Sequence, residues 1–348
     1  MQVIDSRNVH DALLLGMEYL FVHGAVRDSR NGRVHEAPTP VTTVYREPTE
    51  RVLFWEDRDA NPFFHFMESL WMLYGQNDLK YVKQFNKGMS KYSDDGKTLH
   101  GAYGWRWRSY FTFDQLPVII ERLKNDREDR RSVLQMWDPV EDLGRQGVDV
   151  PCNTTIYFKI DKDNRLQMTV CNRSNDIIWG AYGANAVHMS MLQEFMAGCI
   201  GVPVGRYYQV SDNYHAYHNV YHKLLDKFLE MDAFDFYGLK SLRALNPYTL
   251  SRVKSYPMFA RTETGEIKTT MREWELDLAK FMGRTPFQDN IEYTDPFFAV
   301  VAEPIQDSWF HHKLGDRDAA MELVESECMS TDWARACYEW LDRRKPKE

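Results

Sequence analysis

Apolar side chains recur at helical spacing in four stretches of the chain. Residues 8–24 place them mainly on one face, so we expect an amphipathic helix that packs on a core. Residues 62–75 begin with a proline, which suits the first turn of a helix, and are then apolar nearly all round, which predicts a buried helix. The same reasoning predicts helices over residues 115–124 and, in a long apolar run, over about 184–200.

Strand-like segments lie between these helices. Residues 42–54, 132–137 and 204–210 are rich in β-branched, aromatic and other apolar side chains, as strands are. Residues 154–160 and 166–171 alternate between apolar and polar side chains on either side of an Asp-Lys-Asp-Asn turn, which predicts a β-hairpin.

Other segments have weaker signals. Residues 81–101 are polar and indicate a loop, whereas residues 211–219 offer capping side chains and indicate the start of a helix. Beyond Pro296 we expect irregular structure to about Gly315, and then a closing helix. No internal repeat, low-complexity tract or linker divides the chain, so we expect one elaborated domain.

Composition narrows the class of protein. The 348 residues are 43% hydrophobic, enough for a substantial core, and the net charge of −8 gives no general attraction to nucleic acid or to anionic membranes. Five cysteines form no short-spaced pairs, which favours a reducing compartment over a disulfide framework. We see neither an apolar signal core nor a run as long as a membrane span, so we expect a cytoplasmic protein with small-molecule partners.

A cysteine and several basic residues gather in the middle of the chain. Cys152 follows Pro151 and precedes the predicted hairpin, so it lies at the entrance of a strand. Arg130, Arg131 and Arg173 occur within the same stretch. A single guanidinium group can donate two hydrogen bonds to the oxygens of one phosphate. The pattern indicates a nucleophile beside an anion site, and the anion we expect is a phosphate.

Glu68 lies in the middle of the helix that we expect to be buried. A carboxylate there must be paired, hydrogen-bonded or protonated, because desolvation of an isolated charge costs too much. A structural salt bridge and a general acid or base are both consistent with this position.

Two basic segments outside the central stretch are each open to two interpretations. Arg27, Arg30 and Arg33 surround an Asn-Gly turn signal, so they form either a solvated loop or a mobile phosphate clamp. The aromatic and basic residues 101–108 could form a nucleic-acid stacking surface or a packed loop.

Histidines give no metal signal in the sequence. His215, His218 and His222 have no carboxylate or cysteine ligands at a suitable spacing beside them. We therefore expect no metal.

The ordered set of these residues resembles the thymidylate synthase family, from roughly Arg27 to Pro296. Its elements occur in family order: Arg30, Glu68-Ser-Leu-Trp71, Tyr103-Gly104, Arg130-Arg131, Trp137, Pro151-Cys152, Arg173-Ser174, Asp176, Gly180, Asn185, Asp212, His215, Tyr217, Asn219 and Asp295-Pro296. The resemblance implies an α/β (α+β) fold with a large mixed β-sheet and packed helices, dimerising through the sheet. We expect a catalytic domain over residues 1–300 and a C-terminal helical extension, residues 301–348, packed on the same domain.

The resemblance implies a site for the 5′-phosphate of a pyrimidine nucleotide. Arg30, Arg173 and Ser174 match the residues that bind this phosphate within one chain. Arg130 and Arg131 match a pair that the family donates across its dimer interface, which implies a homodimer with shared sites.

Contacts to the base and the sugar follow from the same resemblance. Asn185 matches the carboxamide that pairs with the edge of the base, and His215 and Tyr217 match the groups on the sugar 3′-hydroxyl. Tyr103 and Asn153 complete the substrate-binding set.

The catalytic residues implied by the resemblance are Cys152, Glu68, Asn185 and Asp176. The thiolate of Cys152 would add to carbon 6 of the base, and nearby arginines would favour that thiolate. Glu68 matches the carboxylate that organises water and proton transfer, and Asp176 matches the residue that reaches the pterin. Asp176 with Trp71 and Arg58 would bind methylenetetrahydrofolate, the one-carbon co-substrate.

Two departures from the family pattern concern the base. Synthases usually have a histidine after the cysteine, where this chain has Asn153. The segment 180–185 before the base-pairing carboxamide is one residue longer than in synthases, and so is the interval that ends at His215.

Two further departures concern the exclusion of water. Synthases place a tryptophan before the Tyr-Gly pair, and the matching position here is Met89, with Tyr92 nearby. Synthases also end soon after their Asp-Pro with an apolar tail that closes over the folate, whereas this chain continues and lacks that ending. A lid suited to hydride transfer is therefore missing or replaced.

These departures favour water over hydride as the group that captures the exocyclic methylene on carbon 5. We expect a pyrimidine nucleotide 5-hydroxymethylase, similar to the deoxyuridylate and deoxycytidylate hydroxymethylases of bacteriophages. Asn185 favours dUMP, and dCMP or a ribonucleotide stays open. A thymidylate synthase in which Tyr92 or Trp105 replaces the missing tryptophan is the nearest alternative. An inactive nucleotide- or RNA-binding relative is an alternative of another class.

Overall fold

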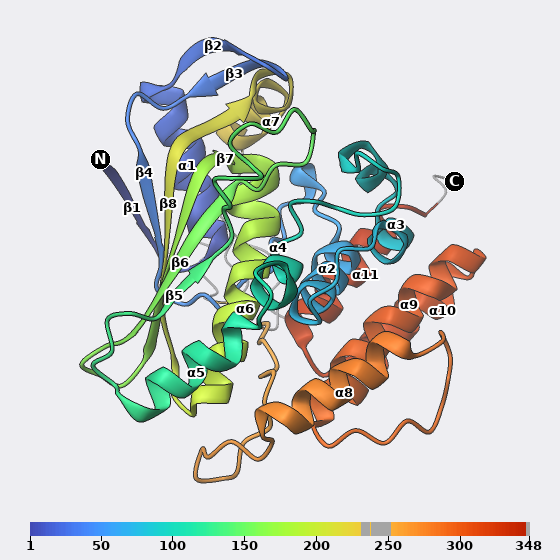
Figure 1. Ribbon diagram of the computed structural model, residues 1–348. Coiled ribbons are helices and arrows are strands. Elements are labelled where there is room, and N and C mark those ends of the chain that lie inside the picture. Colours follow the sequence, from blue (N-terminus) through green and yellow to red (C-terminus); the bar gives the residue numbers. More distant parts are fainter. Residues whose placement is uncertain (231–236, 238–251, 346–348) are drawn as a thin grey trace.

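A mixed β-sheet forms one side of the molecule in the computed structural model, which describes residues 1–230, 237 and 252–345 (Figure 1). Six strands follow the order β1-β4-β8-β7-β6-β5, and the β2–β3 hairpin joins through β3 to β8. β1 with β4 and β7 with β8 are parallel pairs, and the other neighbours are antiparallel. The strands are β1 Gln2–Ser6, β2 Ala25–Ser29, β3 Gly32–Glu36, β4 Val41–Tyr45, β5 Val133–Gln135, β6 Asn153–Ile160, β7 Leu166–Asp176 and β8 Val204–Tyr217. The predicted mixed sheet is confirmed.

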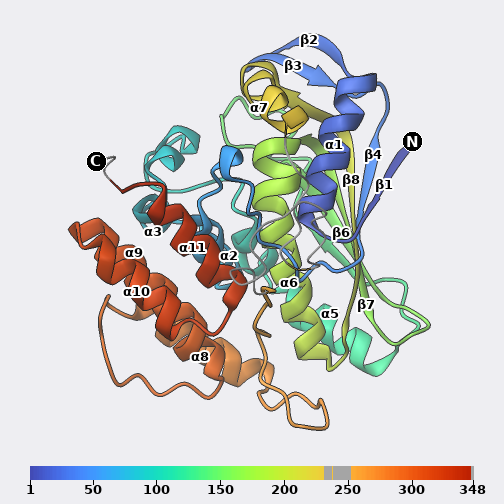
Figure 2. The same ribbon diagram turned by 180° about the vertical axis from the view of Figure 1, so that it is seen from behind.

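Helices cover the sheet and extend away from it. α1 and α6 lie on the sheet, while α2, α3 and α8–α11 form a second group beyond α6 (Figure 2). The longer helices are α1 Val9–His23, α2 Pro62–Leu73, α3 Leu79–Phe85, α5 Gln115–Asn125, α6 Asn185–Ile200, α7 His218–Glu230, α8 Met271–Gly283, α9 Glu303–Leu314, α10 Arg317–Glu327 and α11 Thr331–Asp342. Short helical segments are η1 Glu56–Arg58, η2 Lys87–Tyr92, α4 Tyr103–Trp105, η3 Arg106–Tyr110, η4 Ile177–Ala184 and η5 Phe298–Ala302. No described helix is both long enough and apolar enough to cross a bilayer.

The two faces of the sheet differ in burial. Leu134, Ile156 and Val170 are paired across β5, β6 and β7, and all three are fully buried. The adjacent row on the opposite face includes Val133 and Tyr157, whose side chains are 43% and 47% exposed. Because successive residues of a strand point to opposite faces, one face belongs to the core and the other presents apolar groups to solvent.

Several predicted segments differ from the structure. β8 continues through residues 211–217, because Ser211 pairs with both β4 and β7 there, and the helix begins only at His218. Residues 79–92, read in part as a loop, form α3 and η2. Residues 298–314, expected to be irregular, form η5 and α9, in which Pro304 occupies the first turn, where its missing N–H costs nothing.

The C-terminal helices pack on the helix that carries Glu68. α9 and α11 both contact α2, and the aromatic rings of Trp309 and Trp340 lie against Phe63. At the end of the chain Arg344 forms an ion pair of 2.6 Å with Asp59, just after η1. The division of the chain at residue 300 stays a prediction, and η5 spans that point.

Candidate active site

Two adjoining cavities lie where β7 and β8 end. The inner cavity has a volume of about 550 Å³, and the outer one about 460 Å³. Arg30, Arg173, Ser174 and Tyr217 line both, so the cavities form one continuous site. The inner cavity also contains the predicted residues Cys152, Glu68, Tyr103, Asn185, Trp71 and Arg58, and the outer cavity contains His215.

Cys152 stands at the entrance of β6, as predicted, and is half-buried. Nη2 of Arg173 lies 3.8 Å from its sulfur, and the same guanidinium donates to the carbonyl groups of Val150 and Pro151. Burial raises the pKa of Cys152 above its usual value of 9.0, while Arg173 and Arg30 lower it. The arginines thus favour the thiolate as expected, but burial outweighs them.

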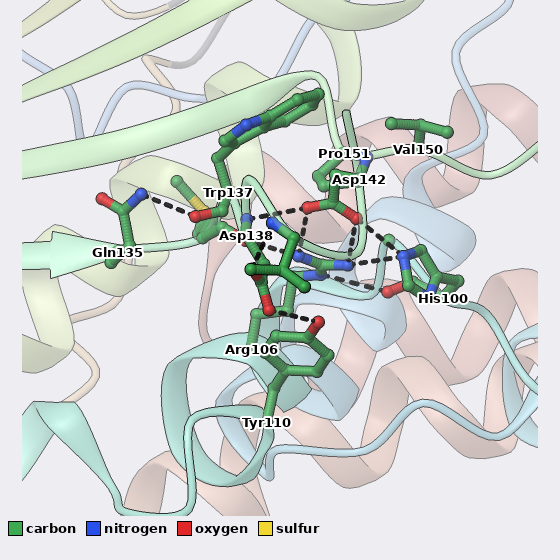
Figure 3. A network of polar contacts seen from close by, with 12 residues as sticks. His100, Arg106, Tyr110, Gln135, Trp137, Asp138, Asp142, Val150 and Pro151 are labelled. Atoms are coloured by element: carbon green, nitrogen blue, oxygen red, sulfur yellow. Dashed lines mark hydrogen bonds and ion pairs between the residues drawn. The ribbon is translucent and has the colours of Figure 1, made fainter. Parts of the chain in front are cut away.

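An internal ion pair fixes the loop that leads to Cys152 (Figure 3). Arg106 is fully buried, and its two terminal nitrogens donate to the two carboxylate oxygens of Asp142 over 2.7 and 2.9 Å. Asp142 also accepts from the N–H of Asp138, and Tyr110 donates its hydroxyl to Asp138. Burial acts to raise the pKa of Asp142, but its hydrogen bonds hold that pKa below the usual value. The loop is therefore anchored in the core.

This arrangement decides between the two interpretations of residues 101–108. Trp107 is fully buried like Arg106, and Arg108 forms ion pairs of 2.7 Å with Asp114 and Glu275. The burial of Arg106 and Trp107 and the ion pairs of Arg108 therefore favour the packed loop.

The phosphate-binding candidates surround the mouth of the site. Arg30 lies at the turn of the β2–β3 hairpin and is exposed, while Arg173 and Ser174 lie near the end of β7. Tyr217 ends β8, and its hydroxyl accepts from Asn31 on the hairpin over 3.4 Å. Hairpin and strand ends thus bring two guanidinium groups and two hydroxyls to one opening.

A row of carboxamides holds the base-pairing candidate in place. Nδ2 of Asn185 donates to Asn175, whose own Nδ2 donates to Gln209 and Ser211. Asn153 is fully buried; its Nδ2 lies 3.4 Å from Oδ1 of Asn185, and its Oδ1 has no hydrogen-bond partner among the described residues. Asn153 therefore contacts the base-pairing candidate Asn185, and its own role in substrate binding stays a prediction.

Two histidines that the sequence analysis did not select lie beside Glu68 at the inner end. Nε2 of His188, on α6, is 3.0 Å from Oε2 of Glu68, yet this buried nitrogen has no hydrogen bond of good geometry within the described chain. Burial, Arg58 and His188 keep the pKa of His65 well below 6.5, so His65 is neutral. The inner end therefore holds a carboxylate and an imidazole nitrogen within ion-pair distance of each other.

Helical spacing would have revealed both histidines. His65 precedes Glu68 by three positions on α2, and His188 follows Asn185 by three positions on α6, so each shares a face with a predicted residue. The apolar surroundings of both helices hid this signal.

An aromatic wall completes the inner cavity. The ring of Trp179 is half exposed there, and the guanidinium of Arg58 lies 4.3 Å from its centre. Burial lowers the pKa of Arg58 to about 10, so it stays charged at neutral pH. Met89 and Tyr92 also line the cavity, and Trp71 forms a buried part of the wall. The wall therefore offers flat rings against which a heterocyclic ring can stack.

Four predicted residues are not among those that line the two cavities: Asn153, Asp176, Arg130 and Arg131. Both carboxylate oxygens of Asp176 accept backbone N–H groups, from Ile178 and Tyr217 among others, so its contact with a pterin stays a prediction. Arg130 and Arg131 are exposed, and Arg131 lies 3.5 Å from Asp129. A role for these two arginines in a partner's site also stays a prediction.

Comparison with known proteins agrees with this geometry. Residues 58–250 match the thymidylate synthase family. The chain is 48% identical to a deoxyuridylate hydroxymethyltransferase of Pseudomonas phage M6, over 99% of this chain and 95% of that protein. It is 37% identical to the deoxyuridylate hydroxymethyltransferase of Bacillus phage SP01 over 56% of this chain and 53% of that protein, and 29% identical to that of Delftia phage PhiW-14 over 59% of each. By motif order, cavity residues and sequence identity, the chain belongs to the thymidylate synthase family.

Proposed function

We propose that this protein is a pyrimidine nucleotide 5-hydroxymethylase that acts on dUMP, with dCMP as the less favoured substrate. The observation that carries the proposal is one cavity lined by Cys152, which lies beside Arg173, and by Glu68, which lies 3.0 Å from Nε2 of His188. The names of the phage relatives point to the same reaction and to uracil as the base.

Cys152 supplies the nucleophile. Its thiolate adds to carbon 6 of the base, and the electron pair of the 5,6 double bond moves to carbon 5 and the neighbouring carbonyl. Arg173 and Arg30 hold the 5′-phosphate at the mouth, with Ser174, and this sets carbon 6 against the sulfur. Asn185 presents one acceptor and one donor to the N3–H and O4 of uracil.

The one-carbon unit comes from methylenetetrahydrofolate, which when bound supplies a carbon at the oxidation level of formaldehyde. Trp71, Trp179 and Arg58 would hold its ring system on the aromatic wall, with Asp176 at the edge of the pterin. After transfer of the carbon to carbon 5, the carbon-5 proton is lost and tetrahydrofolate leaves as its bond to the one-carbon unit breaks. The nucleotide then carries an exocyclic methylene at carbon 5 and still has the sulfur at carbon 6.

Glu68 and His188 then direct water to that methylene. One of them takes a proton from water as the hydroxyl oxygen bonds to the methylene carbon, and the released electron pair restores the 5,6 double bond as the thiolate of Cys152 leaves. His65 stays neutral, so it can orient water without competing for the proton. The product is the 5-hydroxymethyl nucleotide, and the thiolate is regenerated.

The composition of the wall supports capture by water instead of hydride. Met89 and Tyr92 stand where synthases have a tryptophan, and Tyr92 is 54% exposed. A methionine at this position leaves water access to the methylene.

A homodimer would complete the phosphate site. The solvent-facing apolar row with Val133 and Tyr157 offers a surface for the sheet of a second chain. Arg130 and Arg131 are exposed and lie just before β5, the edge strand that carries Val133. We place this dimer in the cytoplasm, where nucleotides and folate occur. For a phage protein this is the cytoplasm of the host cell.

A product assay tests the proposal. The protein is incubated with methylenetetrahydrofolate and, separately, with dUMP, dCMP or CMP, and the nucleotide mass and dihydrofolate absorbance are measured. We expect dUMP to gain a hydroxymethyl group without formation of dihydrofolate. A methyl group together with dihydrofolate would instead show a thymidylate synthase, the activity for which the matched family is named.

An inactive family member that binds RNA would leave every nucleotide unchanged. The buried Arg106 and Trp107 remove the surface on which that idea depended.

A further inference from the structure

Three histidines from distant parts of the sequence meet outside the nucleotide site. His35 lies on β3, and His218 and His222 lie one turn apart at the start of α7, in the upper part of Figure 1. One nitrogen of each ring lies within 4.8 Å of the other two, and Nε2 of His35 is 3.0 Å from Nδ1 of His218. None of the three lines either active-site cavity.

We propose that His35, His218 and His222 bind a divalent transition-metal ion, with Zn²⁺ as the reference ion. A tetrahedral zinc ion with Zn–N bonds of about 2.0–2.1 Å holds its nitrogen ligands about 3.3 Å apart. The separation of the His35 and His218 nitrogens is already close to that value. These two nitrogens share a hydrogen bond, which the metal ion would replace, and a nitrogen of the exposed His222 ring lies within 4.8 Å of both. Three imidazoles and one open position also suit Ni²⁺ and Cu²⁺.

A neighbouring ring holds His35 in place. The ring of Tyr221 packs 4.6 Å from that of His35 and limits its movement.

The sequence predicts no metal, because His215, His218 and His222 have no carboxylate or cysteine ligands at a suitable spacing beside them. His215, which it grouped with His218 and His222, instead lines the outer cavity. The missing ligand is His35, which lies 183 positions from His218 and reaches it only because β3 pairs with β8.

The position of the cluster gives the metal a structural role. β3 is one arm of the hairpin whose turn carries Arg30 and Asn31, and α7 begins directly after Tyr217. These three residues all line the active site. A metal that joins β3 to α7 would fix the hairpin against the end of β8, and so would hold Arg30 ready for the phosphate.

Metal binding is measured directly on the full-length protein. After treatment with EDTA and removal of the chelator, we expect calorimetric titration with ZnCl₂ to show one ion per chain, and bound Co²⁺ to give the absorption of tetrahedral coordination. His222→Ala should weaken Zn²⁺ binding by at least about tenfold, since one of three ligands is lost. His222 is exposed, so this variant should keep the fold, which circular dichroism checks.

Control variants distinguish zinc binding at the three-histidine cluster from nonspecific zinc binding at the protein surface. His23→Ala removes an exposed histidine on α1 and should leave the zinc affinity unchanged. His35→Asn should weaken binding like His222→Ala. Absence of one-to-one binding, or unchanged zinc affinity in either His35→Asn or His222→Ala, would overturn the proposal.

A second readout tests the link to the hairpin. Zn²⁺ should tighten the binding of dUMP, measured without methylenetetrahydrofolate, by a few-fold in the unmodified protein but not in His222→Ala. This measurement needs no turnover, so it is independent of the product that the enzyme makes. Equal tightening in both proteins would contradict the structural role.

Discussion

The mouth and the inner end of the active site differ in the burial of their residues and in the elements that carry them. At the mouth, exposed groups such as Arg30 and Arg173 come from strand ends and a hairpin turn. At the inner end, Glu68, His65 and His188 are buried and face one another from α2 and α6. Charges in contact with water are screened, whereas buried groups interact strongly. The mouth is therefore suited to capture of a charged substrate, and the inner end to proton transfer.

The largest effect should come from the residue between the two ends. We expect Cys152→Ser to lower kcat by at least about a thousandfold, because serine is a far weaker nucleophile. Binding of dUMP, measured by calorimetry, should change by less than about threefold, because the mouth is intact. Loss of nucleotide binding in this variant would show that the two ends are not separable.

A smaller loss should follow from a change at the inner end alone. His188→Gln should lower kcat by about a hundredfold, the usual contribution of a general acid or base, while KM for dUMP stays nearly constant. The exocyclic methylene should also last longer, so an added thiol should trap it as a thioether that mass spectrometry detects. His23→Gln serves as the control. A rise in KM without any loss of kcat would contradict a role for His188 in proton transfer.

The mouth should show the reverse pattern. Arg30→Gln should raise KM for dUMP by about tenfold and leave kcat within about twofold, because it removes one charge-assisted contact that is equal in the ground and transition states. The increase should shrink at high salt. Arg33→Gln alters the same hairpin but no residue that lines the cavities, and it should leave KM unchanged. An equal effect of both variants would indicate general attraction instead of contact.

The smallest effect concerns pH. Because the thiolate reacts and burial raises the pKa of Cys152, alkylation of this residue by iodoacetamide should become faster as pH rises above neutral. Arg173 lowers that pKa, so Arg173→Gln should move the rise to higher pH. Rates are read from the peptide that contains Cys152. A shift to lower pH would contradict the assigned charge effect.

The sequence predicted the mouth better than the inner end. Cys152, Arg173 and Ser174 belong to short motifs whose order along the chain is informative, and the structure brings them together. His188 was not predicted as a site residue. The apolar sequence of its helix indicates that the helix is buried, but it does not indicate which residue of another helix His188 contacts. The contact of His35 with His218 could not be predicted either, since nothing in the local sequence reveals which strand pairs with β8.

Prediction of the fold had a similar limit. The buried helices α2 and α6 follow from their apolar runs, and the β6–β7 hairpin follows from alternation and its turn. The strand β8 was cut short because its last residues are polar, although they pair on both sides within the sheet. Polar side chains that line a site look like loop residues when the sequence is read alone.

The ion pair between Arg106 and Asp142 has a consequence for evolution. Both side chains are fully buried, so loss of either partner leaves a buried charge without its counter-ion. This costs about 3–5 kcal/mol of folding free energy, a large part of the stability of a typical domain. A lineage that changes one position first would pass through a poorly folded protein with a displaced nucleophile loop. Related chains should therefore keep both residues or have exchanged both, and these two positions should vary together even where the surrounding loop drifts freely.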